Sequence, residues 1–219
     1  MNLLDNYRGQ ISYKDIIQLD GAISACHINY GKSPLFYMTD AKSISITSRK
    51  NSLSSKNSID TLNNISSFFD VERGLKKEDK IILWKNFWLE YINSYNKMTN
   101  ILPRSIVTVY LGRHAIELGI KYILLKKLNK IEKGHDLGIL IKKLFNEFQI
   151  KEDYMKYVDS FCILFCNNIE GGNSEFFRYP EYKENYYFAG NRLDIEWLNY
   201  NISLVLLKLV HFSGLDNEI

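Results

Sequence analysis

Two stretches decide the fold of this chain, Gly112-Arg-His-Ala-Ile-Glu-Leu-Gly-Ile-Lys121 and Lys133-Gly-His-Asp-Leu-Gly-Ile-Leu140. In the first stretch, His114, Glu117 and Lys121 stand at positions i, i+3 and i+7. Residues with this spacing share one face of an α-helix. The pattern predicts a helix that ends before residue 133 and a second helix that abuts it, with their polar side chains gathered at one place.

Arg113 and Asp136 extend this interpretation. Arg113 precedes Glu117 by four residues, so the carboxylate of Glu117 can pair with Arg113 or with Lys121 inside one helix. Asp136 directly precedes an apolar run and is a good N-cap residue. A structural role is therefore one interpretation of the pattern: Glu117 supports helix pairing, Asp136 caps a helix, and His135 is hydrogen bonded at a turn.

Helical periodicity continues over residues 76–219. Short connections favour antiparallel neighbours, and the region predicts a mainly α bundle of four to five helices. The expected helices include residues 81–98, 103–129, 136–148, 152–169 and 193–212.

Residues 1–75 have a different character. The segment 43–47, Ser-Ile-Ser-Ile-Thr, alternates as a half-buried strand does, and residues 51–60 are polar and typical of a linker. We therefore expect two parts: a small β-rich N-terminal segment over 1–75, formed by a β-meander and a polar linker, and the helical bundle over 76–219.

The composition excludes several classes of protein. Of 219 residues, 46% are hydrophobic and 14% aromatic, which argues against disorder. Three cysteines are an odd number and do not suggest the disulfide framework of a small secreted domain. The first residues do not resemble a signal peptide, and no window is long and apolar enough to span a bilayer. We expect a cytoplasmic protein without a membrane partner.

The net charge of +3 conceals an asymmetry along the chain. Residues 76–150 carry 14 Lys/Arg and seven Asp/Glu, whereas residues 151–219 carry six and eleven. The basic and acidic parts can pair within or between chains, or the basic part can face a polyanion or a protein partner. The basic residues at the end of the second expected helix also fit a solvated terminus that opposes the helix dipole; they include Lys126, Lys127, Lys130 and Lys133.

The stretch 113–140 resembles the HEPN domain (higher eukaryotes and prokaryotes nucleotide-binding). Members of that family often show His-x-x-Glu-x-x-x-Lys on one helix and His-Asp-Leu at the start of the next, as at His114 and His135. Arg178-Tyr-Pro resembles a tripeptide that precedes the last helix in some HEPN-like proteins. The resemblance implies a HEPN-like bundle, a role in RNA or nucleotide biology such as phage defence, abortive infection or a toxin–antitoxin pair, and a homodimer.

The resemblance also raises the question of ribonuclease activity. Many HEPN proteins are metal-independent ribonucleases whose site is Arg, four to six residues, then His. In this chain no arginine is followed by histidine at that spacing. The missing motif favours a protein that acts by binding or assembly, and no metal or cofactor is implied.

Two alternatives remain open. The first is a divergent metal-independent endoribonuclease, in which His114 or His135 is the acid/base. Phosphate or RNA would then be bound by Arg113, Lys121 and Arg178, with Glu117 and Asp136 as structural support. The second is a purely structural protein-interaction module.

Three further features favour packing over chemistry. Cys162 and Cys166 share a helical face, but no histidine pair lies near them in the sequence, so core packing is favoured over zinc. Gly112 and Gly119 lie within a helix, where they predict close helix packing. The aromatic residues of segment 173–190 can stack on bases, although packing is the favoured use.

Overall fold

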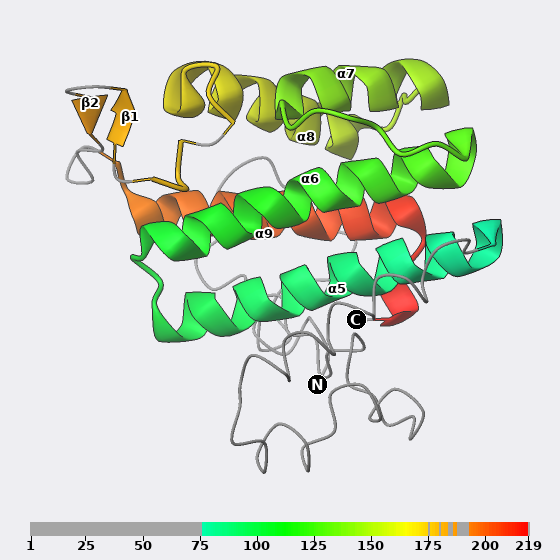
Figure 1. Cartoon of the computed structure of the whole chain (residues 1–219), viewed down its shortest axis with the longest axis horizontal. Coiled ribbons are helices and arrows are strands. Elements are labelled where there is room, and N and C mark those ends of the chain that lie inside the picture. Colours follow the sequence, from blue (N-terminus) through cyan, green and yellow to red (C-terminus); the bar gives the residue numbers. More distant parts are fainter. Residues whose placement is uncertain (1–75, 175, 180, 184–185, 188–192, 219) are drawn as a thin grey trace, which may run out of the picture.

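The computed structural model describes residues 76–174, 176–179, 181–183, 186–187 and 193–218. These residues are mainly α-helical, and five α-helices pack as a bundle (Figure 1). The β-meander expected within residues 1–75 lies outside the described residues. The elements are α5 (Lys77–Ile101), α6 (Ile106–Leu128), α7 (Leu137–Phe148), α8 (Asp153–Leu164), the π-helix η3 (Phe165–Glu170), β1 (Glu181–Lys183), β2 (Tyr186–Tyr187), α9 (Ile195–Ser213) and the 3-10 helix η5 (Asp216–Glu218).

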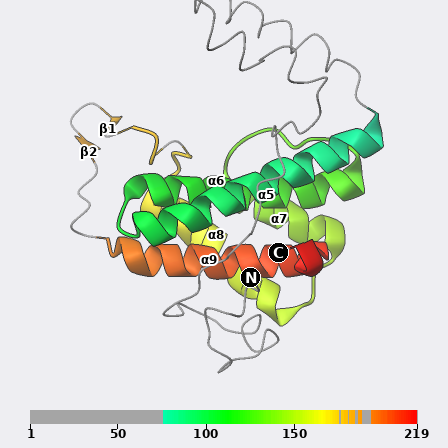
Figure 2. The same cartoon turned by 90° about the horizontal axis from the view of Figure 1, so that it is seen from below.

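Helix α6 is the centre of the bundle. It contacts α5 on one side, α7 on the other and α9 beside it, and α8 packs against α7 and α9 (Figure 1). Seen from below, α5 runs along α6 with α9 next to the pair (Figure 2). Helix α6 is buried almost throughout its second half, because it has neighbours on three sides.

The relation between α6 and α7 differs from the predicted antiparallel pair. His135, just before α7, contacts Glu117 in the middle of α6, whereas Lys127 at the end of α6 contacts Glu147 at the end of α7. The two helices therefore run in the same direction, and the prediction of antiparallel neighbours was wrong for this pair. Residues 129–136 return along α6 as an irregular strap. Extended chain covers about 3.3 Å per residue against about 1.5 Å in a helix, so the strap is long enough to pass three turns.

Side-chain caps fix where the helices begin. The side chain of Asp136 accepts a hydrogen bond from the backbone N–H of Ile139, which confirms the predicted cap of α7. Ser105 and Asp194 cap α6 and α9 in the same way. Gly214 ends α9 with a φ of 76°, a left-handed conformation that glycine adopts without strain.

Helix α8 is shorter than the expected helix over 152–169. After Leu164 the chain continues as the π-helix η3. This helix ends at Gly171, whose φ is 58°. A π-turn is wider than an α-turn and changes the direction in which the following side chains project. Glu170, the last residue of η3, thereby lies buried against α6.

Two glycines allow α5 and α9 to approach α6 closely. A Cβ atom at Gly119 would stand 2.6 Å from the ring of Trp88, and one at Gly112 would stand 2.5 Å from both Tyr95 and Ile202. Trp88 and Tyr95 are almost completely buried, so neither ring can move into solvent. These contacts confirm the predicted close packing at both glycines.

The connection from η3 to α9 is irregular over its described part. It includes a short antiparallel pairing of β1 and β2, in which Glu181 lies opposite Tyr187. In the described ranges, no helix combines the length and apolar character needed to cross a bilayer.

Replacing Gly119 by alanine should destabilise the protein. We expect a net loss of about 1–2 kcal/mol, because the forced movement of Trp88 exceeds the gain in helix propensity. Urea unfolding measures the loss. Gly138→Ala is the comparison variant: its Cβ would meet a carboxylate oxygen of Asp136 at 3.2 Å and no buried ring, so its loss of stability should be smaller. A Gly119→Ala protein as stable as the comparison variant would contradict the packing argument.

Candidate functional site

The Glu117 carboxylate is the centre of the candidate site. Glu117 lies in the middle of α6 with a side chain that is only 2% exposed. The guanidinium of Arg113, one turn earlier, donates to its Oε2, and Nζ of Lys121, one turn later, lies 2.8 Å from its Oε1. Both cations are themselves buried. The helical spacing identified in the sequence thus forms an internal ionic network.

His135 joins this network from the strap. Its Nδ1 lies 2.9 Å from Oε1 of Glu117, while its side chain is 52% exposed. Arg113 also donates to the backbone carbonyl of His135 through Nη2. The ring and the main chain of this residue are therefore both fixed to α6, although much of the imidazole faces solvent.

Glu170 is a member that the sequence interpretation missed. Nε of Arg113 lies 2.7 Å from Oε1 of Glu170, and the Sγ of Cys166 lies 3.5 Å from Oε2. Arg113 and Glu170 are 57 positions apart, and their pairing depends on the π-turn of η3. The network core therefore holds two cations, Arg113 and Lys121, and two carboxylates, so its formal charges balance.

His114 occupies an aromatic surface next to the network. Its ring meets Tyr91 edge-on at 4.7 Å and stacks on Tyr110 with a centroid distance of 6.1 Å. Its Nδ1 lies 3.8 Å from Oε2 of Glu117. Arg178 is exposed and covers the other end of this row: its guanidinium is 5.9 Å from the Tyr110 ring, and Nε donates to the Tyr110 hydroxyl at 3.2 Å.

The electrostatics follow from burial and from the number of cations around each carboxylate. Burial raises the pKa of Glu117, but the hydrogen bond from Lys121 and the charge of Arg113 outweigh it, so the pKa lies below its usual value. Among the described residues, Arg113 is the cation that pairs with Glu170, and burial keeps the pKa of Glu170 above its usual value. For His114, whose charged form is a cation, burial lowers the pKa. This effect exceeds the opposite effect of the Glu117 charge, so the pKa of His114 lies below its usual value. His114 therefore favours the neutral form.

The structure brings the expected site residues together, but some of them are buried in ion pairs and others are exposed. His114 and His135 approach the same carboxylate, and Arg178 lies at the end of the ring row. Arg113 and Lys121, expected to bind phosphate or RNA, are buried in ion pairs. Only the imidazole of His135 and the side chain of Arg178 are substantially exposed among these groups. An external ligand would meet those two first.

The Glu117–His135 pair defines a tautomer. An ionised carboxylate only accepts hydrogen bonds, so Nδ1 of His135 must carry the proton. In the neutral ring, Nε2 is then the nitrogen that accepts a proton or a hydrogen bond. The same arrangement, a buried carboxylate that orients an imidazole, is used in general acid–base catalysis.

The cysteines and the terminal lysines belong to the structural frame. Cys162 and Cys166 are buried free thiols, and burial raises the pKa of Cys166 to about 11. No group of three or more His, Cys, Asp or Glu in the described part of the chain is arranged to hold a metal ion. Lys126 and Lys127 donate to the carbonyls of Ser213 and Glu147 at the C-terminal ends of α9 and α7, where a cation opposes the helix dipole.

Removing Arg113 should destabilise the fold strongly. Arg113→Met keeps much of the side-chain volume but leaves two buried carboxylates short of a cation, and we expect a loss of about 3–5 kcal/mol. Chemical denaturation measures it. Lys156→Met is the control, because the Lys156–Asp153 pair is 70% and 81% exposed; its unfolding midpoint should not move. Equal stability of both variants would contradict the structural role of Arg113.

His114 should make folding sensitive to mild acid. Its pKa is lower in the folded chain than the ordinary value of 6.5, so the unfolded chain binds a proton first as the pH falls. The free energy that neutral His114 contributes to folding is fully present above a pH of 6.5, and it is lost as the pH falls towards the pKa of His114 in the folded chain. His114→Phe keeps a ring between Tyr91 and Tyr110, and it should unfold with a smaller dependence on pH between about 7 and 5 than the wild type. An unchanged dependence would argue against this role.

Comparison with protein-family models, with curated proteins and with solved structures finds no match for this chain.

Proposed function

We propose that this chain is a HEPN-like protein that binds RNA through the surface formed by His135, His114, Tyr110 and Arg178. One observation carries the proposal: a buried carboxylate holds the half-exposed imidazole of His135, on the same half of α6 where Arg178 covers a row of rings. The context is that implied by the resemblance, namely phage defence, abortive infection or a toxin–antitoxin pair.

The chemistry of this surface suits an RNA strand. Arg178 is exposed, and a guanidinium can bind a phosphate through two hydrogen bonds. Nε2 of His135 can accept a hydrogen bond from a ribose 2′-hydroxyl, which distinguishes RNA from DNA. The two network carboxylates are only 2% exposed, so they present little negative surface to a phosphate.

Binding is favoured over cleavage for two reasons. The Arg-x(4–6)-His motif of the family ribonucleases is missing from the sequence. In addition, Arg113 and Lys121, the cations nearest to His135 in the network, already neutralise Glu117 and Glu170. Stabilising the charge that develops on a phosphate needs cations directed at it.

A divergent metal-independent endoribonuclease is the second candidate, and the Glu117–His135 hydrogen bond favours it. In that reaction the 2′-oxygen of a nucleotide attacks the adjacent phosphorus while its proton passes to Nε2 of His135. The bond from phosphorus to the next 5′-oxygen breaks, and that oxygen takes a proton from water. The products are a 2′,3′-cyclic phosphate and a free 5′-hydroxyl. Glu117 would stabilise the imidazolium, and Arg178 would contact the phosphate.

Titration of the full chain into fluorescently labelled single-stranded RNA tests the proposal. We expect binding that weakens between about 50 and about 200 mM salt. Arg178→Ala should weaken it about tenfold and reduce the salt dependence by about one phosphate contact, and His135→Ala should weaken it with the salt dependence unchanged. Lys156→Ala is the control, since Lys156 is an exposed cation of α8.

The same RNA incubated with EDTA and analysed on a denaturing gel separates the two candidates. Intact RNA that is bound supports the binding protein. Cleavage that His135→Ala abolishes supports the ribonuclease, and cleavage that it retains removes His135 from the reaction. RNA that is neither bound nor cut contradicts both.

A further inference from the structure

The strap carries exposed positive charge next to His135. It leaves the end of α6, returns beside that helix and reaches the start of α7, as the green trace between these helices shows (Figure 1). Ile131, Glu132 and Asp136 are half-buried in it. The side chains that the strap exposes are two ammonium groups, an amide and an imidazole, namely those of Lys130, Lys133, Asn129 and His135. The exposed row of the strap therefore contains no carboxylate.

The two carboxylates of the strap do not neutralise its lysines. Oε2 of Glu132 lies 2.8 Å from Nζ of Lys143 on α7, and the Glu132 side chain is only 14% exposed. The Asp136 side chain caps α7 by accepting a backbone hydrogen bond. In the described part of the chain, no ion pair joins Lys130 or Lys133 to a carboxylate. Two positive charges on the strap therefore face solvent without a compensating anion.

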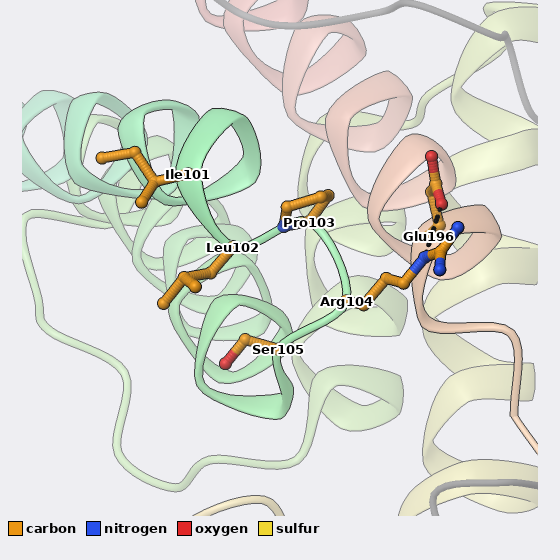
Figure 3. A pocket seen from close by; sticks show the side chains of 6 residues that line it. All are labelled: Ile101, Leu102, Pro103, Arg104, Ser105 and Glu196. Atoms are coloured by element: carbon orange, nitrogen blue, oxygen red, sulfur yellow. Dashed lines mark hydrogen bonds and ion pairs between the residues drawn. The ribbon is translucent and has the colours of Figure 1, made fainter.

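Two exposed cations elsewhere on the bundle differ in this respect. At the α5–α6 corner, Nε of Arg104 lies 3.1 Å from Oε2 of Glu196 (Figure 3). On α8, Nζ of Lys156 lies 2.6 Å from Oδ1 of Asp153. A cation beside its own carboxylate adds little net charge to the surface, so it attracts a polyanion weakly. The lysines of the strap keep their full charge for an external anion.

The lysines continue the surface that we propose for RNA. Arg178 lies on the ring of Tyr110 near the start of α6. His135 is held by Glu117 at the middle of the helix, and the strap lies beside the helix from there to its end. From Tyr110 to Leu128, α6 spans about 27 Å at about 1.5 Å per residue. A strand stacked at about 3.4 Å per nucleotide covers this length with about eight nucleotides.

We propose that the strap lengthens the RNA site, so that a single strand lies along α6 with its phosphates on Arg178, Lys133 and Lys130. This inference rests on the proposed function and defines its substrate as a single-stranded segment of about eight nucleotides. A much shorter strand cannot reach both Arg178 and Lys130. A lysine ammonium binds phosphate as a point charge on a flexible stem, and contacts to phosphate carry no direct base preference. A line of cations beside aromatic rings is a common way to bind a single strand.

Fluorescence anisotropy of the full chain with single-stranded RNA of about twelve and about four nucleotides tests the inference. The wild type should bind the longer RNA at least about tenfold more tightly. Lys130→Ala/Lys133→Ala should weaken binding of the longer RNA about tenfold and should remove most of the advantage of length. It should also reduce the slope of log K against log salt by about 1.4, because each phosphate contact to a single strand contributes about 0.7.

Lys97→Ala/Lys156→Ala is the matched control, because it removes two exposed cations, on α5 and α8, and changes the net charge equally. Lys130→Arg/Lys133→Arg keeps both charges and should bind as the wild type does. Circular dichroism shows whether each variant is folded.

The outcomes separate this inference from the proposed function. A wild type that binds neither RNA would overturn both. Suppose instead that the longer RNA is bound, that binding depends on Arg178 and His135, and that the strap variant binds it no more weakly than the control. The strap would then lie outside the RNA site, and the proposed function would stand without it.

Discussion

The buried carboxylate of Glu117 is the constraint on which the centre of this molecule depends. A carboxylate that loses its water requires cations and hydrogen-bond donors at close range. Arg113 and Lys121 supply them from the same helix, and His135 from the strap. Arg113 in turn requires Glu170, which ties η3 to α6. One ionic network therefore joins three segments of the chain, namely α6, the strap and η3.

This requirement also divides the residues of the 113–121 stretch between support and function. Arg113 and Lys121 have the residue types of a phosphate-binding site, but their charges are balanced within the core. A cation neutralised by a buried carboxylate attracts an external phosphate weakly. Under the proposed function, recognition of RNA would fall to His135, which the network holds at its edge, and to Arg178 on the adjacent row of rings.

Much of the bundle could be predicted from the sequence because its signals are local. Apolar periodicity predicted the helices, Asp136 marked the start of one of them, and Gly112 and Gly119 indicated close approach. The shared direction of α6 and α7 could not be predicted, because the length of a strap does not show whether it turns or runs back. Glu170 was missed because its contact with Arg113 joins distant positions through a π-turn, which has no periodic signal.

The position of His135 links the candidate site to the stability of the fold. Its carbonyl is held by Arg113 and its ring by Glu117, so both attachments lie within one charge-balanced cluster. A ligand that binds His135 only when its imidazole is held in this cluster would stabilise the folded protein, because it would not bind the unfolded chain. Loss of Glu170 would remove one partner of Arg113, the residue that donates to the carbonyl of His135, although Glu170 itself is buried. The exposed residue His135 is thus held in part by Arg113, whose other nitrogens pair with the buried carboxylates of Glu117 and Glu170.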